Sequence, residues 1–101
     1  MRTVLLWTIV DGKKDELIRQ HLNFQKDIVE ATQAIPGFIG LEKYVLDNKL
    51  VEILDLDISL QEFGQQFASN KGVRDFFRAI APCITESLSD ADARIMQRIA
   101  E

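Results

Sequence analysis

The sequence predicts one α+β domain, and three observations support this fold class. First, a short N-terminal run has apolar residues at both its odd and its even positions. Second, a long stretch repeats apolar residues every three or four positions. Third, two segments with strand-like alternation of side chains flank a tight turn. The chain has 101 residues, 47% hydrophobic and 28% charged, which is the balance of a single globular domain. A chain of this length buries roughly 65% of its unfolded surface, so a partner subunit would add useful stability.

Residues 3–10, TVLLWTIV, are predicted to form a strand covered on both faces, because β-branched and aromatic residues fill both alternating positions. The run is too short to cross a membrane and has no small-residue cleavage site, so a cytoplasmic protein without a membrane partner is expected. Apolar residues then recur at helical spacing from about Lys14 to Ala34, which predicts one long helix with a clear core face. Pro36 and Gly37 end this helix.

Residues 38–46 and 50–57 are predicted to pair as a β-hairpin around Asp47 and Asn48, whose residue types tolerate a tight turn. If residue 46 pairs with residue 49, Lys43 lies opposite Glu52 in a favourable cross-strand charge pair. The same register places apolar residues of both strands on the face that helices should cover: Ile39, Leu41 and Val45 opposite Leu56, Leu54 and Leu50. The other face mixes aromatic, aliphatic and acidic groups.

A second helical region follows the hairpin. Ser59 and Glu62 have the spacing of a capping box and are predicted to start a helix. Residues 70–72 interrupt this helix, and apolar residues then repeat at helical spacing over residues 73–80 until Pro82.

The C-terminal segment completes the element order. Residues 83–88 are a candidate fourth strand, although the helical stripe can also be continued to Ile84, and residues 89–92 are expected to cap a terminal helix over residues 95–99. Strand, helix, strand, strand, helix, strand is the ferredoxin-like β-α-β-β-α-β arrangement, here with an added C-terminal helix. One such domain is predicted over residues 1–101.

A sheet of this kind has helices on one face only, and its other face predicts a dimer. The first strand has Leu5, Trp7 and Ile9 on one side and Val4, Leu6 and Val10 on the other, so whichever side is uncovered would expose large apolar groups, each worth about 1.5–3 kcal/mol if buried. A second copy of the sheet would cover them. We therefore expect a homodimer that closes as a dimeric α/β barrel and leaves small cavities for ligand.

Charge and residue counts exclude several classes of function. The net charge is −4 and the 12 basic residues are spread along the whole chain, which argues against a nucleic-acid partner. With a single cysteine, Cys83, and a single histidine, His21, the chain has neither an internal disulfide nor a Cys/His zinc cluster. No Walker loop, dinucleotide-binding glycine motif, serine nucleophile elbow or HExxH motif is present, so no cofactor or metal is expected.

His21 is the candidate catalytic residue, because histidine is the side chain that titrates near neutral pH without perturbation. It lies in the apolar stripe of the predicted long helix, where it should point inward as a general acid or base. Gln25, one turn later, is expected to bind a carbonyl or phenol of the ligand. The alternatives are a hydrogen-bonded core histidine and a glutamine that bonds nearby backbone.

Aromatic and acidic side chains of the strands are candidate substrate-binding residues. Trp7 offers a flat surface for an aromatic ligand and Tyr44 offers a ring and a hydroxyl, although Trp7 would equally suit a dimer core. Glu42 and Asp55 share the mixed face of the hairpin as candidate paired carboxylates, diagonal to each other in the predicted register. A solvated or dimer-rim position is the alternative for both.

Arg74 and Arg78 are four residues apart and so share one flank of a helix, where they could hold an acidic ligand or the phosphate of a carrier protein. Asp75 beside them favours surface ion pairs as the alternative. Cys83 has no acid or histidine partner nearby in the sequence and is not expected to act as a nucleophile.

Several segments resemble known proteins. PGFIGLEKY at 36–44, with SLQEF at 59–63 and FAS at 67–69, resembles the dimeric α/β-barrel superfamily that includes the antibiotic-biosynthesis monooxygenases. GVRDFFRAIAP at 72–82, followed by SDADAR at 89–94, is similar to the SchA/CurD-like proteins of aromatic polyketide gene clusters. The resemblance covers nearly the whole chain.

This resemblance implies a cytoplasmic accessory enzyme of aromatic (type II) polyketide biosynthesis, most of all a cyclase of the tetracenomycin type that directs ring closure and aromatisation of a poly-β-ketone. Two alternatives are a cofactor-independent monooxygenase that oxidises a phenol or anthrone to a quinone, and a non-catalytic protein that binds or scaffolds an intermediate. Neither enzyme class uses a metal or flavin. The implied partners are the polyketide intermediate, a second copy of the chain, and an acyl carrier protein or other polyketide synthase component.

The hairpin departs from the cyclase pattern. Tetracenomycin-type cyclases carry histidines around the hairpin, whereas residues 38–57 contain none. No cyclase catalytic residue is therefore carried over to this chain.

Overall fold

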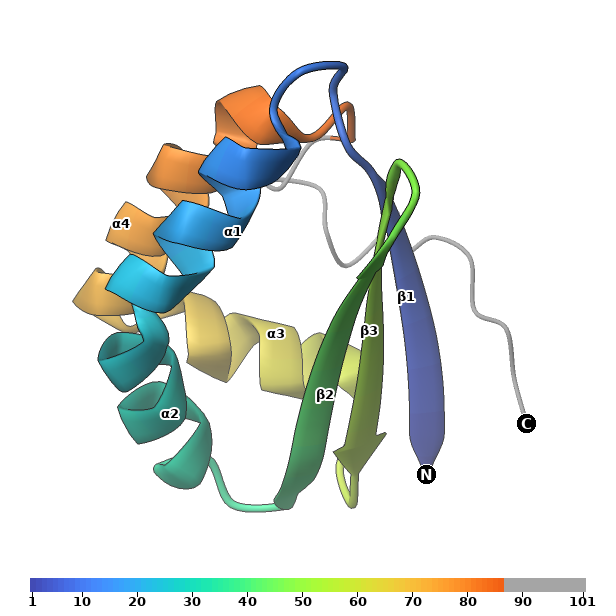
Figure 1. The fold of residues 1–101 in the computed structure, drawn as a ribbon. Helices are drawn as coiled ribbons and strands as arrows, with labels where there is room; N and C mark the ends of the chain where they lie inside the picture. The colour runs from blue at the N-terminus through green and yellow to red at the C-terminus, as the bar shows by residue number, and fades with distance from the viewer. Residues whose placement is uncertain (87–101) are drawn as a thin grey trace.

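The computed structural model describes residues 1–86, which form a sheet on one side and a layer of helices on the other (Figure 1). Within this range the sheet has three antiparallel strands in the order β1-β3-β2. The strands are β1 (Arg2–Thr8), β2 (Phe38–Leu46) and β3 (Lys49–Leu56). The helices are α1 (Lys14–Asn23), α2 (Gln25–Gln33), α3 (Leu60–Ala68), α4 (Lys71–Ile80) and the short 3-10 helix η1 (Ala81–Cys83). The predicted α+β class is confirmed.

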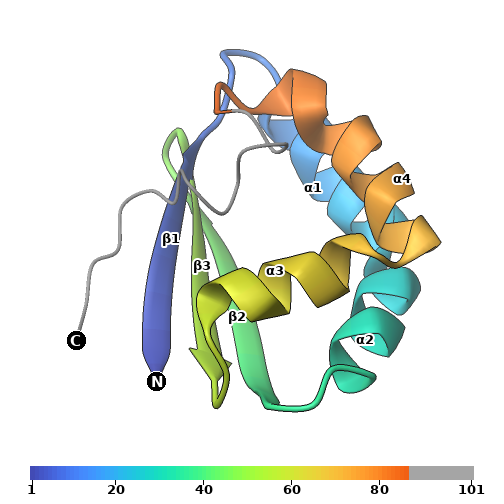
Figure 2. The ribbon, with the colours of Figure 1, turned by 180° about the vertical axis from the view of Figure 1, so that it is seen from behind.

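The four α-helices lie on the same face of the sheet, with α3 crossing in front of β2 and α4 running beside α1 in the view of Figure 2. Ser59 caps α3 as predicted, because its Oγ accepts a hydrogen bond from the backbone N–H of Glu62. The predicted interruption is present but lies earlier than expected: α3 ends at Ala68 and α4 begins at Lys71, so residues 71–72 are helical. Asn70 caps α4 by accepting from the N–H of Val73.

The prediction of one uninterrupted helix over 14–34 is wrong, because Phe24 separates α1 from α2. Its backbone has φ −104° and ψ 11°, outside the helical range. Backbone hydrogen bonds still cross the break, from the Phe24 N–H to the Gln20 carbonyl and from the Ile28 N–H to the Phe24 carbonyl. The Phe24 ring packs on Phe76 with 5.7 Å between centroids, so tertiary packing holds the bend.

The hairpin register is the predicted one over most of its length. Leu46 lies opposite Lys49, and Lys43 lies opposite Glu52. The register shifts between Phe38 and Gly40, so that Phe38 rather than Ile39 lies opposite Leu56.

The shift turns the Phe38 ring toward the helices. The ring stacks on Phe63 with 6.0 Å between centroids, while Ile39 is left 60% exposed. The larger aromatic side chain takes the buried position that strict alternation would have given to Ile39.

The predicted fourth strand is not formed over residues 83–86. Pro82 and Cys83 belong to η1, and the next residue, Ile84, makes a single antiparallel bridge to Ile9. Thr85 donates its N–H to the Thr8 carbonyl, so the segment runs beside the end of β1. Residues 87–88 of that strand and the predicted terminal helix lie outside the described residues.

The core lies between the inner face of the sheet and the helices. Leu54 and Leu56 of β3 are 2% exposed, and Leu17, Val73 and Phe76 from α1 and α4 are equally buried. In residues 1–86, no helix combines the length and apolar character needed to cross a bilayer.

Candidate functional site

A cavity of about 120 Å³ lies between the inner face of the sheet and helices α3 and α4; we call it the apolar chamber. Its walls are aliphatic and aromatic except for the charged pair Lys43 and Glu52, the ring nitrogen of Trp7 and backbone groups. The apolar lining residues include Leu5, Leu41, Leu50, Leu54, Leu60, Phe63, Phe67, Phe76, Phe77, Ile80 and Ile84. An apolar cavity with a few convergent polar groups is the usual form of a small-molecule site.

The three polar side chains of the chamber come from three neighbouring strands. Trp7 of β1 donates its indole N–H to Oε1 of Glu52 on β3, with 2.6 Å between the atoms. Nζ of Lys43 on β2 lies 3.3 Å from Oε2 of the same carboxylate. The Lys43 and Glu52 side chains are only 19% and 16% exposed, so the pair is largely removed from water. We call these three residues the inner polar triad.

His21 of α1 packs close to this triad. Its Nδ1 lies 2.8 Å from the Leu17 carbonyl oxygen, which can only accept, so Nδ1 carries the hydrogen and Nε2 carries the lone pair. Within residues 1–86, the buried Nε2 atom has no hydrogen-bond partner. The ring meets Phe76 edge-on with 4.9 Å between centroids, and Nζ of Lys43 lies 5.1 Å from the centroid of that same Phe76 ring.

Burial lowers the pKa of His21, and the positive charge of Lys43 lowers it further. The hydrogen bond to Leu17 and the charge of Glu52 act in the opposite direction and are smaller effects. The imidazole is therefore neutral at pH 7, and its Nε2 can accept a proton.

A larger groove of about 510 Å³ lies between the α1–α2 pair and strand β2; we call it the helix groove. It brings together three of the sequence-predicted site residues, His21, Gln25 and Tyr44. Leu41, Lys43 and Leu50 line both this groove and the apolar chamber, so the two spaces adjoin at Lys43. Trp7, also predicted, faces the chamber and not the outer side of the sheet.

Glu42 and Asp55 lie away from these cavities. Glu42 is opposite Ile53 and Asp55 is opposite Gly40, so the two carboxylates are diagonal, as the predicted register requires. Both alternate with inward-facing neighbours and so point to the outer face of the sheet. Asp55 lies 3.5 Å from the N-terminal ammonium, an ion pair at the edge of the sheet.

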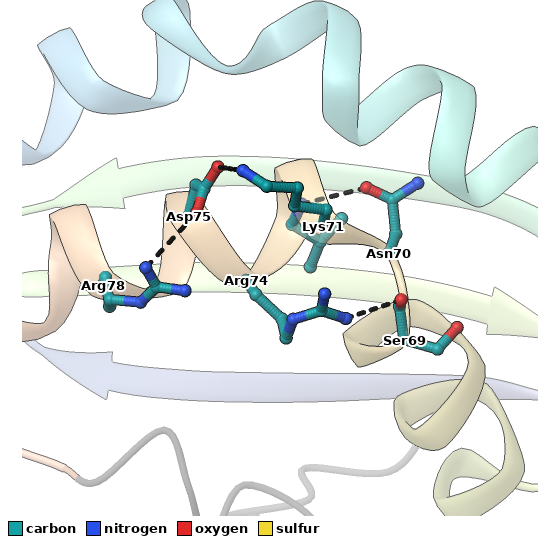
Figure 3. A network of polar contacts seen from close by, with 7 residues as sticks. Ser69, Asn70, Lys71, Arg74, Asp75 and Arg78 are labelled. Atoms are coloured by element: carbon teal, nitrogen blue, oxygen red, sulfur yellow. Dashed lines mark hydrogen bonds and ion pairs between the residues drawn. The ribbon is translucent and has the colours of Figure 1, made fainter.

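Arg74 and Arg78 also line neither cavity. Both belong to a network of polar contacts on α4 (Figure 3). Arg74 donates to the Ser69 carbonyl at 2.6 Å and so satisfies the C-terminal end of α3. Asp75 lies between Lys71, at 3.0 Å, and Arg78, at 3.4 Å. The structure thus places both arginines in surface contacts of α4, on the side away from its buried residues.

Sequence reasoning did not select Lys43 and Glu52 as site residues, although it paired them. The sequence did contain an indication, since the predicted register places an ion pair on a strand face otherwise made of leucine, isoleucine and valine. Charged side chains are rarely buried, so a charged pair on such a face indicates a candidate site. Cys83 is 1% exposed, and burial raises the pKa of its thiol, which disfavours the thiolate form that a nucleophile needs. Among residues 1–86, no three His, Cys, Asp or Glu side chains group as metal ligands.

Comparisons with known proteins show the fold alone. No protein-family model and no curated protein matches the chain. One similar solved structure is the crystal structure of a conserved protein from Methanosarcina mazei Go1, which is 16% identical in sequence with a TM-score of 0.59. The match covers 85% of this chain and 82% of that one. Because the identity is so low, it supports a shared α+β architecture and leaves function to the site.

Proposed function

We propose that this protein is a cytoplasmic accessory enzyme of aromatic polyketide biosynthesis, a cyclase that directs ring closure of a poly-β-ketone. One observation carries the proposal: an apolar chamber holds a buried ammonium–carboxylate pair, and a neutral histidine with an unpartnered ring nitrogen lies beside it. The segments at 36–44 and 72–82 that resemble proteins of this superfamily supply the substrate class.

The shape of the site suits a ligand with several rings. Ligand pockets usually measure about 300–1,000 Å³, so the chamber of about 120 Å³ is too small by itself and the helix groove of about 510 Å³ is large enough. We place the body of the substrate in the helix groove, between Gln25 and Tyr44, with one end entering the chamber past Lys43. The apolar walls favour a folded, neutral chain over an extended, hydrated one.

The chemistry of ring closure needs proton transfers and no change of oxidation state. A methylene between two carbonyls loses a proton, the enolate attacks a further carbonyl, and loss of water leaves an aromatic ring. His21 exchanges protons with the substrate in the dehydration step, because its neutral Nε2 is a base within the site.

We also propose the finer architecture expected from the sequence, a ferredoxin-like domain that pairs as a dimeric α/β barrel. Val4 and Leu6 of β1 lie opposite Ile53 and Val51 of β3 on the outer face, where all four are only partly buried. No helix of residues 1–86 covers this face. A second copy of the sheet would cover it, and an acyl carrier protein could then approach Arg74 and Arg78 on the exposed side of α4.

Accurate-mass profiling of the producing organism, with and without this gene, tests the function without a choice of substrate. For a cyclase, deletion accumulates unclosed or misclosed products of unchanged oxidation state. Accumulation of an intermediate that lacks one oxygen atom would instead identify a cofactor-independent monooxygenase. Restoration of the wild-type profile by a His21→Ala gene would remove His21 from the mechanism and favour a non-catalytic binding role.

A further inference from the structure

We infer that Glu52 is the general base that enolises the substrate and that Lys43 holds the resulting enolate. This assignment rests on the proposed function and names the two residues that carry its first step. It also specifies the chemical class of the substrate at the inner end of the site: a neutral ketone with an acidic methylene.

Two partners hold the carboxylate of Glu52 in place, and it can still accept further hydrogen bonds. Its Oε1 accepts from Trp7 at 2.6 Å and its Oε2 faces Lys43 at 3.3 Å, which fixes the plane of the group. A carboxylate has about four lone-pair positions, so these two partners leave acceptor capacity free. Glu52 lines the apolar chamber, where a substrate methylene can reach it.

Lys43 is placed to take a second oxygen. Its Nζ lies 3.3 Å from Glu52, longer than the roughly 2.7–2.9 Å of a tight ammonium–carboxylate hydrogen bond. The side chain lines both the chamber and the helix groove. A carbonyl oxygen that enters from the groove therefore meets the ammonium before it reaches Glu52.

The charges of the pair match the reaction. Glu52 and Lys43 together carry no net charge, so a neutral ketone enters without repulsion. When the proton moves, the negative charge passes from Glu52 to the substrate oxygen while the ammonium stays in place. The ion pair is exchanged for another ion pair, so little reorganisation is needed inside a site of low polarity.

An oxygen of Glu52 takes a proton from the methylene carbon, the C–H electron pair forms the carbon–carbon double bond, and the carbonyl oxygen becomes an enolate bound to Nζ of Lys43. In ring closure the enolate carbon bonds to a second carbonyl carbon, and the new alkoxide takes the proton back from Glu52. The carboxylate is restored, and no redox partner takes part.

The probe for this step is 2-tetralone, a neutral bicyclic ketone with an acidic benzylic methylene. Proton NMR in D₂O follows the loss of its methylene signal, and the fluorescence of Trp7, the single tryptophan, reports its binding. We expect wild-type protein to accelerate exchange above buffer and Glu52→Gln to lose about 100-fold or more of that acceleration while still binding the probe. Lys43→Met should also slow exchange.

Three further variants distinguish a catalytic base from a structural carboxylate. Added formate should restore exchange to Glu52→Ala, because a small carboxylate can occupy the vacated position, and a purely structural role would not respond. Glu30→Gln, a matched change on the exposed side of α2, should leave exchange unchanged. If His21→Gln abolishes exchange and Glu52→Gln does not, His21 is the base and the inference is overturned.

The experiment also distinguishes the inference from the function on which it rests. If wild-type protein binds 2-tetralone without accelerating exchange, the role of Glu52 is overturned, but the proposed ligand site is still supported. Wild-type protein that shows no binding by Trp7 fluorescence counts against the proposed ligand site, and the inference falls with it.

Discussion

At the scale of single residues, the inner face of the sheet is defined by polar groups whose partners fix their state. Trp7 and Lys43 contact opposite oxygens of Glu52, and His21 is held in one tautomer by a backbone carbonyl. All lie among apolar side chains, where an unpaired charge is costly. Their protonation and pairing are therefore tied to the stability of the fold as well as to chemistry.

The lowered pKa of His21 predicts how stability depends on pH. Between its ordinary value of 6.5 and its lower pKa in the fold, the unfolded chain binds more protons than the native one. The free energy of unfolding should therefore fall as the pH drops through this window and level off below it. Urea unfolding followed by Trp7 fluorescence from pH 8 to pH 5 measures this, with His21→Gln as the comparison. Equal pH dependence in both proteins would show that burial does not shift this histidine.

The ion pair of the chamber predicts strong coupling between its members. Lys43→Met leaves the Glu52 carboxylate largely buried with Trp7 as its remaining partner, and should cost about 2–3 kcal/mol of unfolding free energy. Adding Glu52→Gln removes that charge and should recover about 1 kcal/mol or more. Denaturant unfolding of the single and double variants gives the coupling. Additive losses would mean that the pair is solvated in solution, as expected for the exposed Lys71 and Asp75.

At the scale of elements, backbone geometry at the entrance to β2 sets the inner face of the hairpin. Gly37 has φ 90°, and a Cβ there would collide with the side chain of Ile58. The chain then shifts register between Phe38 and Gly40, which turns Phe38 toward Phe63. The turn and the bulge together decide which residues of β2 face the helices.

Two glycines three positions apart, Gly37 before this bulge and Gly40 within it, give a matched test. Gly37→Ala should destabilise the protein by more than about 1 kcal/mol, because alanine disfavours a positive φ and the added methyl meets Ile58. Gly40→Ala should change stability by no more than about 0.5 kcal/mol, because no atom lies within 4 Å of its added Cβ. Thermal or urea unfolding compares them. Equal effects would contradict the geometry at the entrance to β2.

At the scale of the whole molecule, the helices and the sheet form two layers with the site between them. The helices lie on one side of the strands (Figure 1), and the residues that line the chamber and the helix groove come from both layers. The outer face of the sheet has no such cover within residues 1–86. A site inside one chain and an apolar face outside it are compatible with a catalytic dimer.

The uncovered face predicts self-association through the sheet. Val51→Lys would place an ammonium at the centre of the outer face, opposite Leu6 and Tyr44, and should convert a dimer into a monomer. Light scattering after size exclusion measures the mass. Leu22→Lys, at a 66% exposed position of α1, is the control and should leave the mass of the dimer unchanged. A wild-type monomer at high concentration would refute the proposed barrel.

Much of the fold follows from local pattern. Capping residues, apolar periodicity and turn chemistry predicted the start of α3, the helical stripe of α4 and the hairpin register through Lys43 and Glu52. These are properties of neighbours along the chain or of a strand and its immediate partner. The break at Phe24 and the shift at Phe38 escaped prediction, because each depends on an aromatic ring packing against a distant one.

The candidate site divides in the same way. The sequence by itself placed His21 and Gln25 on an inward helix face, Trp7 on a buried strand, and Lys43 opposite Glu52, because periodicity and register set direction. Only the tertiary structure decided that Glu42, Asp55, Arg74 and Arg78 lie outside the cavities and that His21 and Lys43 both pack against Phe76. Distances between elements depend on how whole layers pack, and no local pattern encodes them.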